Sequence, residues 1–223
     1  MAPHDHPHGH DHSHDHDHGH AQPHRHPNQP DVEDKPYTHY MVLAQAVGEL
    51  LIDKKRFSTD DLRRTIEIID AKSPAAGARM VARAWVDPAF KARMMKDVNA
   101  AAAELGIDAG TIIIRAIENE PKVHNVVVCT LCSCYPRLLI GLPPDWYKSR
   151  AYRSRMVRDP RTVLAEFGTR LPKDVEVRVH DSTADLRFLI LPMRPKGTEN
   201  KTEAELAELV TRDAMIGVTA IDR

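Results

Sequence analysis

The sequence predicts an α/β (α+β) protein, with a helical N-terminal part followed by a catalytic domain in which strands and helices mix. Residues 37–106 place apolar side chains at helical spacing. After residue 106, several stretches become rich in β-branched residues, which is typical of strands. All three cysteines of the 223-residue chain fall within six positions, directly after one of these stretches. A chain of this length can bury a substantial core.

The first 30 residues differ from the rest of the chain. Eleven of the fourteen histidines lie at or before His26, and most of them alternate with Asp, Pro and Gly. Because such a composition buries too little apolar surface to order itself, we predict a disordered tail over residues 1–30. Alternating imidazoles and carboxylates bind cobalt, nickel, copper or zinc ions weakly. Metal capture or delivery is therefore one hypothesis, and a purification tag or a tail without function is the other.

Residues 31–106 are predicted to form a helical arm. Its first helix carries one apolar stripe, made of Leu43, Ala46, Val47, Leu50 and Leu51. Ser58 and Asp61 form a capping-box pattern that begins a second helix, which ends at the Ser73-Pro74 step. Asp87-Pro88 begins another helix, and Gly106 ends it. These stripes serve as core or as surface for a partner chain.

Residues 107–223 are predicted to form the catalytic domain. Strands are expected at residues 111–117, 126–128, 175–179 and 186–191. Helices are expected at residues 145–157 and 159–168, and the capping-box pair Thr202 and Glu205 begins a last helix. The cysteine cluster then follows a buried strand, which gives a site a rigid base.

Cys129, Cys132 and Cys134 are the strongest functional signal in the chain. Their spacing is too tight for ordinary disulfide pairing and suits the binding of one metal ion. Two other interpretations stay open. Buried thiols can act as small hydrophobic side chains. A structural zinc site would need a fourth ligand, from His124, His180 or a partner chain.

Residues 129–134 are called the claw segment below. Counting bonds from the Cys132 sulfur, an ion can close a six-membered ring to the Ser133 nitrogen, a five-membered ring to the Cys134 nitrogen, and another to the Cys134 sulfur. With Cys129 on one axial side, the ion has five ligands and one open position. Loss of two amide protons requires a strongly Lewis-acidic ion with octahedral or tetragonal preference, so tetrahedral zinc fits poorly.

The sequence Cys-Thr-Leu-Cys-Ser-Cys followed by Tyr-Pro, together with Gly-Leu-Pro-Pro-Asp-Trp-Tyr-Lys at residues 141–148, resembles nitrile hydratase alpha subunits. The likeness covers most of residues 38–223. It implies a layered α-β-β-α catalytic domain that hydrates a small-molecule nitrile to an amide. Thr130 in this resemblance implies low-spin non-corrin Co(III), with Fe(III) as the alternative. It further implies that Cys132 is a sulfinate and Cys134 a sulfenate, whose oxygen acts as nucleophile or base.

The resemblance also implies partners. The helical arm would embrace a beta subunit, without which the chain would be inactive, and a cobalt-loading activator protein would assist. We expect Asp181 and Arg187, which lie near the end of one predicted strand and the start of the next, to support the claw segment. An ordinary surface ion pair between them is the alternative.

Arg137 departs from the nitrile hydratase pattern, which has Trp at this position. Cys-Ser-Cys-Tyr-Pro-Arg, with a His/Asp-rich N-terminus, resembles instead the gamma subunit of thiocyanate hydrolase, which converts thiocyanate to carbonyl sulfide and ammonia. An added arginine suits an anionic substrate. A non-catalytic metal-binding or metal-delivery protein is a second alternative.

Several function classes are disfavoured. The net charge of −1 provides no global attraction for nucleic acid or an anionic membrane. The arginines of residues 150–161 lack the interleaved aromatic side chains of a nucleic-acid platform, so we expect a solvated or subunit-facing surface. The apolar runs are too short to span a bilayer. With no secretory signal visible and no even-numbered cysteine framework, a cytoplasmic location is expected.

Overall fold

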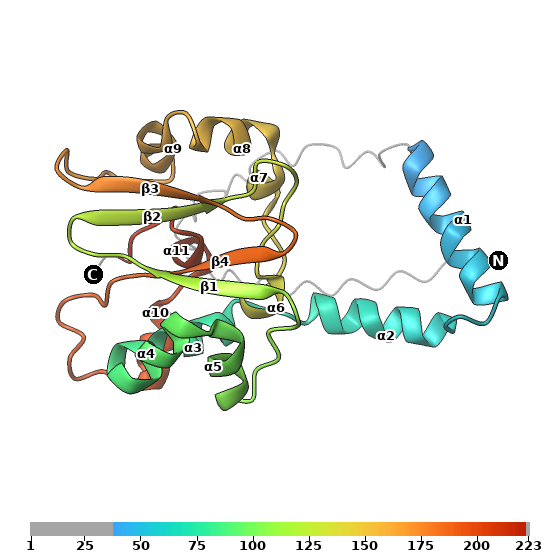
Figure 1. Cartoon of the computed structure of the whole chain (residues 1–223), viewed down its shortest axis with the longest axis horizontal. Coiled ribbons are helices and arrows are strands. Elements are labelled where there is room, and N and C mark those ends of the chain that lie inside the picture. The colour runs from blue at the N-terminus through green and yellow to red at the C-terminus, as the bar shows by residue number, and fades with distance from the viewer. Residues whose placement is uncertain (1–37, 222–223) are drawn as a thin grey trace, which may run out of the picture. The chain divides into compact units, whose positions relative to one another are not determined.

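The computed structural model of the chain describes residues 38–221 (Figure 1), so the predicted tail at residues 1–30 lies outside the described part. Contacts divide the chain into two units, residues 1–51 and residues 52–223. Helix α1, His39–Asp53, has no buried residue. Its exposed apolar side chains include Met41, Val42, Leu43, Val47 and Leu50. The predicted apolar stripe therefore has no partner among the described residues.

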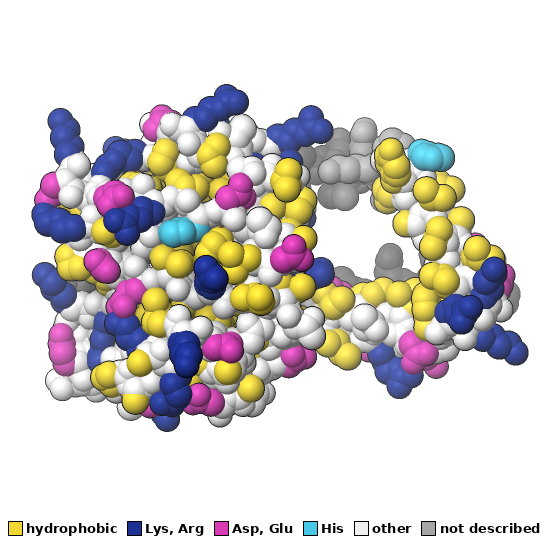
Figure 2. All heavy atoms as spheres, in the orientation of Figure 1, with side chains coloured by type: hydrophobic (Ala, Val, Ile, Leu, Met, Phe, Trp, Pro, Cys, Tyr) yellow, Lys and Arg dark blue, Asp and Glu magenta, His cyan; other side chains and the backbone are white. Residues whose placement is uncertain are grey.

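Helix α2, Thr59–Asp70, begins as the sequence predicts. The Ser58 hydroxyl accepts from the Asp61 N–H at 3.1 Å, and the Asp61 carboxylate accepts from the Ser58 N–H at 3.0 Å. This capping box satisfies backbone donors that a helix start leaves free. Like α1, helix α2 buries no side chain. Figure 2 shows yellow hydrophobic side chains along both helices.

Three further helices precede the strands: α3 (Ala75–Val86), α4 (Pro88–Lys96) and α5 (Val98–Glu104). The sequence predicted one helix from Asp87-Pro88 to Gly106, and the structure breaks it at Asp97. Asp97 has extended backbone angles, φ −152° and ψ 103°, and its carboxylate accepts from the Ala100 N–H at 2.9 Å. An Asp in this conformation is a strong N-cap, so it ends α4 and begins α5.

Four strands follow: β1 (Ile113–Glu118), β2 (Val123–Val128), β3 (Glu176–Asp181) and β4 (Leu186–Leu191). Strand β1 pairs in parallel with β4, and β2 pairs in parallel with β3. In the second pair, Val128 is opposite Asp181, so the carboxyl ends of β2 and β3 coincide. The chain enters the claw segment at that shared edge.

The remaining helices are short: α6 (Arg137–Ile140), α7 (Asp145–Lys148), α8 (Arg150–Met156), α9 (Pro160–Glu166), α10 (Glu203–Leu209) and α11 (Arg212–Ile216). The predicted helix at residues 145–157 is two helices, because extended Ser149 accepts from the Tyr152 N–H and caps α8. The predicted capping box of Thr202 and Glu205 is confirmed. Helices α6 and α11 were not predicted.

The part of the chain that contains the strands is layered as the resemblance implied. In Figure 1, α8 and α9 lie beyond the β2–β3 pair, and α3, α4, α5 and α10 lie beyond the β1–β4 pair. Helices α4 and α5 contact β1, and α9 contacts β3. The order is therefore α-β-β-α.

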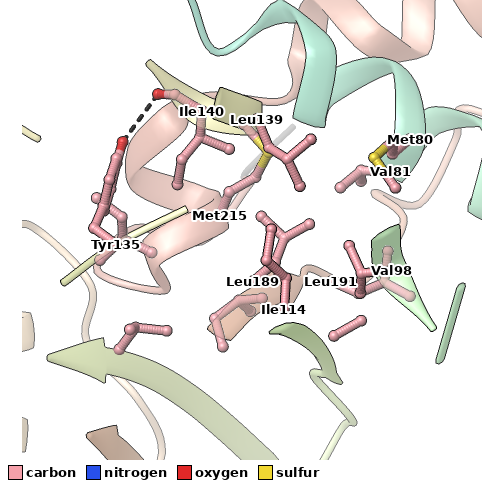
Figure 3. Packing of buried hydrophobic residues seen from close by; sticks show 14 of the residues in the cluster. Met80, Val81, Val98, Ile114, Tyr135, Leu139, Ile140, Leu189, Leu191 and Met215 are labelled. Carbon is pink, nitrogen blue, oxygen red and sulfur yellow. Dashed lines mark hydrogen bonds between the residues drawn. The ribbon is translucent and has the colours of Figure 1, made fainter. Parts of the chain in front are cut away.

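One core joins the helices to both strand pairs (Figure 3). Met80 of α3 and Val98 of α5 share it with Ile114 of β1, Leu191 of β4 and Met215 of α11. Helices α3 to α5 therefore pack inside the same core as the strands, although the sequence assigned them to the arm that ends at residue 106. Packing of that arm on a partner stays a prediction. Among residues 38–221, no helix is long and apolar enough to cross a membrane.

Candidate metal centre

The claw segment begins directly at the end of β2, where the Ser182 N–H donates to the Val128 carbonyl at 2.7 Å. Cys129 is fully buried, Cys134 is half-buried and Cys132 is exposed. The segment thus runs from the core to the surface within six residues. Its first sulfur is held by packing, and its later sulfurs are accessible to small molecules.

The three sulfurs converge. Cys129 Sγ lies 3.6 Å from Cys132 Sγ, and Cys132 Sγ lies 3.3 Å from Cys134 Sγ. All three lie within 4.8 Å of one another. These separations are longer than the S–S bond of a disulfide, about 2.05 Å, so the thiols are free and share one focus. Such a cluster can hold a metal ion.

Neither histidine proposed as a zinc ligand joins this cluster. A ring nitrogen of His124, Nε2, lies 2.7 Å from the Gly217 carbonyl. Nε2 of His180 lies 2.9 Å from Asn125 Oδ1. Burial lowers the pKa of both histidines. Both rings are thus engaged in structural hydrogen bonds, and a zinc site within the described residues would lack its fourth ligand.

The backbone of the claw segment also faces the sulfurs. The Cys132 N–H donates to Cys129 Sγ at 3.3 Å. The hydrogen bond with the Cys134 thiol, followed by the N–H groups of Ser133 and Cys134, lowers the pKa of the Cys132 thiol. Burial and then the bond with Cys132 raise the pKa of the Cys134 thiol to about 12, while the charge of Arg187 opposes that rise. The nitrogens that bond counting identified therefore lie beside the sulfurs.

Asp181 anchors the start of the claw segment. Its two carboxylate oxygens accept from the Thr130 N–H at 2.9 Å and from the Thr130 hydroxyl at 2.6 Å. This contact follows from the parallel register, which sets Asp181 opposite Val128 at the end of the strand pair. The carboxylate fixes the turn that leads from Cys129 to Cys132.

Arg187 and Arg137 lie at the other end of the claw segment. Arg187 on β4 donates from Nη1 to the Tyr135 carbonyl at 2.8 Å, and exposed Arg137 begins α6. Together with the last residues of the claw segment they border a cavity of about 210 Å³, whose walls are Cys132, Ser133, Cys134, Tyr135, Arg137, Pro143 and Arg187. We call it the claw cavity. The alternative, a surface ion pair between Asp181 and Arg187, is not among the ion pairs of residues 38–221.

Three buried tyrosines near the claw segment donate to backbone carbonyls, and only Tyr147 donates to a residue of the segment itself. Tyr147 donates to the Cys134 carbonyl at 2.9 Å, Tyr152 to the Val127 carbonyl at 2.7 Å, and Tyr135 to the Ile140 carbonyl at 2.9 Å. Burial raises the pKa of all three hydroxyls above its usual range. They therefore remain donors. Tyr135 and Tyr147 belong to the motifs that carry the family resemblance, which is the signal that could have identified them.

The arginines of residues 150–161 fall into two groups, those that bind other parts of the chain and those that line a surface cavity. Arg155 pairs with Glu166, and Arg161 donates to backbone carbonyls before β3. Arg150, Arg153 and Arg158 line an open cavity beside Thr130 and Leu131. These positions agree with the predicted solvated or subunit-facing surface.

The family model described as "Nitrile hydratase, alpha chain" matches residues 38–219. The low-molecular-weight cobalt-containing nitrile hydratase subunit alpha of Rhodococcus rhodochrous is 52% identical over 178 residues, which cover 78% of this chain and 86% of the relative. The thiocyanate hydrolase subunit gamma of Thiobacillus thioparus is 42% identical over 191 residues, which cover 80% of this chain and 79% of the relative.

Solved structures agree with these relatives. A recombinant thiocyanate hydrolase with partially modified cobalt centres matches with a TM-score of 0.76 and 42% identity, covering 82% of this chain and 90% of that one. A double mutant of the Fe-type nitrile hydratase from Comamonas testosteroni Ni1 matches with a TM-score of 0.73 and 41% identity, and the match covers 83% of this chain and 93% of that one. From the match to residues 38–219 and the shared fold, this chain belongs to the nitrile hydratase alpha-chain family, a family of enzyme subunits.

Proposed function

We propose that this chain is the alpha subunit of a nitrile hydratase, which adds water across the C≡N bond of a nitrile to give an amide. The observation that carries the proposal is the convergence of three free thiols within 4.8 Å, two of which, those of Cys132 and Cys134, line the claw cavity. The identity of 52% to a cobalt-containing nitrile hydratase alpha subunit supports the same reaction.

The donors fit a trivalent ion. Cys129, Cys132 and Cys134 supply sulfur, and Ser133 and Cys134 supply backbone nitrogens beside those sulfurs. Thiolates and deprotonated amides suit an octahedral ion. Cobalt-containing relatives support Co(III), and the Fe-type structural match keeps Fe(III) as the alternative. When bound, the ion supplies Lewis acidity toward the nitrile.

The cysteines would then be modified. Cys132 is exposed, so it is accessible to oxidants and suits the sulfinate, while half-buried Cys134 suits the sulfenate. Oxidation withdraws electron density from sulfur and places an oxygen at the wall of the claw cavity. We assign the Cys134 sulfenate oxygen as the nucleophile or base. Asp181 and Arg187 hold the two ends of the claw segment, through Thr130 and Tyr135.

The proposed partner is a beta subunit. The relatives are named as subunits, and helices α1 and α2 bury no side chain of their own. The exposed apolar stripe of α1 is the surface we assign to the beta subunit. A cobalt-loading activator protein, which the family resemblance implies, belongs to the same proposal.

Co-expression with a beta subunit and activator in cobalt medium tests the proposal. Elemental analysis should find cobalt, and mass spectrometry of the claw peptide should find about three added oxygens. The complex should hydrate acrylonitrile and retain its metal against a mild chelator. Fully alkylatable thiols would refute the oxidised claw, stoichiometric iron would refute cobalt, and rapid metal loss without hydration would favour a delivery protein.

Thiocyanate hydrolysis is the second candidate. It is favoured by the two arginines that border the claw cavity and by the 42% identity to a thiocyanate hydrolase gamma subunit. Assaying one preparation with both acrylonitrile and thiocyanate separates the two candidates. Formation of carbonyl sulfide and ammonia from thiocyanate, without hydration of the nitrile, would make thiocyanate hydrolysis the favoured function.

A further inference from the structure

Ser182 is a buried polar residue directly after β3, and the proposed reaction gives it no role. Only 1% of its surface is exposed. Its Oγ is buried and has no hydrogen-bond partner among residues 38–221. A buried hydroxyl without a partner is costly and therefore rare, and a role at a functional site is one reason for its presence.

The backbone places Ser182 beside the first cysteine of the claw segment. The Ser182 N–H donates to the Val128 carbonyl at 2.7 Å, directly after Val128 and Asp181, the last register pair of β2 and β3. One step further along both strands are Cys129 and Ser182. Register partners in a parallel pair carry their side chains on the same face, and successive residues alternate between the two faces.

The side-chain contacts agree with this alternation. Asp181 accepts from the Thr130 hydroxyl and from the Thr130 N–H, so the Asp181 and Thr130 side chains share one face of the strand ends. Cys129 and Ser182 therefore lie on the opposite face. Both are buried, with exposures of 0% and 1%. The Ser182 hydroxyl and the Cys129 sulfur are thus placed next to each other on the buried face.

A cysteine sulfur that binds a metal ion is a suitable acceptor for this hydroxyl. Such a sulfur has lost its proton and carries negative charge, so it accepts hydrogen bonds and donates none. The Cys129 sulfur already accepts from the Cys132 N–H at 3.3 Å, and the Val128 carbonyl already accepts from the Ser182 N–H. The Ser182 hydroxyl would be a second donor to the Cys129 sulfur.

Building on the metal centre proposed above, we propose that Ser182 donates a hydrogen bond to the Cys129 sulfur and so tunes how strongly that sulfur donates electrons to the bound ion. Bond counting puts Cys129 on one axial side and leaves the opposite side open. A hydrogen bond to a metal-bound sulfur withdraws electron density from it. The ion is then a stronger Lewis acid toward a nitrile at the open position. Ser182 is a positioning residue, because it acts through Cys129.

The test compares Ser182→Ala with the native chain in the cobalt-loaded complex with its beta subunit. Without the hydroxyl, the sulfur is a stronger electron donor, so the sulfur-to-cobalt charge-transfer absorption should shift to longer wavelength. The kcat for acrylonitrile should fall about tenfold, the range of one hydrogen bond to a charged group. Ser182→Thr keeps a hydroxyl and should return both values toward those of the native chain.

A matched control is Thr169→Val. Thr169 is also buried, and its hydroxyl donates at 2.8 Å to the carbonyl of Val218, outside the claw segment. This variant should lower Tm and leave the absorption and kcat unchanged.

Thermal unfolding gives a readout apart from turnover. In the cobalt-loaded complex, Ser182→Ala removes a hydrogen bond and should lower Tm. In the same complex expressed without cobalt, the hydroxyl has no partner to lose, so Ser182→Ala should keep the native Tm or raise it.

The outcomes separate this proposal from the proposed function. An absorption shift and a lower kcat in Ser182→Ala, reversed by Ser182→Thr and missing in Thr169→Val, support the hydrogen bond. An unchanged absorption, or an equal fall in Tm with and without cobalt, makes Ser182 a purely structural residue and overturns the proposal while nitrile hydration stands. If the native complex binds no metal ion and hydrates no nitrile, the proposed function fails and the role of Ser182 fails with it.

Discussion

Replacing Tyr147 with Phe should loosen the metal centre without disturbing the bulk of the fold. The Tyr147 side chain is fully buried, and its hydroxyl donates to the Cys134 carbonyl at 2.9 Å. Removing the hydroxyl takes away this bond and leaves that carbonyl without the donor. A lost bond of this type costs about 1–2 kcal/mol. For a chain of this size, that lowers Tm by roughly 2–8 °C.

The effect should extend to the metal because Cys134 is one of its proposed ligands. If about 1.4 kcal/mol of the loss falls on the loaded state, metal release accelerates about tenfold. The assay follows cobalt transfer from the purified complex to a chelator. Tyr152→Phe is the matched control, since its hydroxyl donates at 2.7 Å to the Val127 carbonyl, in β2 before the claw segment. Equal release rates for the two variants, despite similar losses in Tm, would refute the reasoning.

Three further outcomes are expected. Asp181→Asn keeps one acceptor for Thr130 and loses the other, so metal content after expression, measured by elemental analysis, should fall while Tm changes little. Burial holds the pKa of His124 below its unfolded value, so the unfolded state binds more protons near pH 6, and the free energy of unfolding should fall as pH drops from about 7 to 5.5. In denaturant unfolding measured across this pH range, His124→Gln should make the free energy of unfolding less dependent on pH. An unchanged pH dependence in the variant would contradict this assignment. Leu43→Glu places a charge in the exposed stripe of α1 and should reduce co-purification of the beta subunit, with Lys54→Glu as a control outside that stripe.

Signals that act within a few residues were predictable from the sequence. The capping boxes at Ser58 and Thr202 need only a hydroxyl and a carboxylate three positions apart, and both are present. The cysteine cluster needs no long-range folding, because three sulfurs within six positions converge by chain connectivity. The four predicted strands are all present: that at residues 186–191 has the predicted ends, and the other three have shifted ends.

Two kinds of feature were not predictable from the sequence. One is a helix end at which a capping residue competes with continuation of the helix, and the other is a contact between residues far apart in the sequence. Apolar periodicity continues through Asp97 and Ser149, yet each adopts extended backbone and caps a new helix, which breaks two predicted helices. Parallel pairing of β2 with β3 brings Asp181 to Thr130 across 51 residues. Proximity in the sequence left a pairing of Asp181 with Arg187 open as the alternative, whereas the two residues contact opposite ends of the claw segment.

The position of the claw segment shows how so short a stretch could hold the five donors proposed above. At its start, Cys129 is buried and the next residue is tied to Asp181 on the neighbouring strand. At its end, the Cys134 carbonyl is held by Tyr147 and the Tyr135 carbonyl by Arg187. Both ends of the claw segment are therefore fixed by contacts with other parts of the chain, and Cys132 and Ser133 lie between them. Pre-organisation of this kind lowers the entropic cost of gathering the donors. It also accounts for a site in which Cys132 and Cys134 line a cavity although the supporting residues come from both strand pairs and from α7.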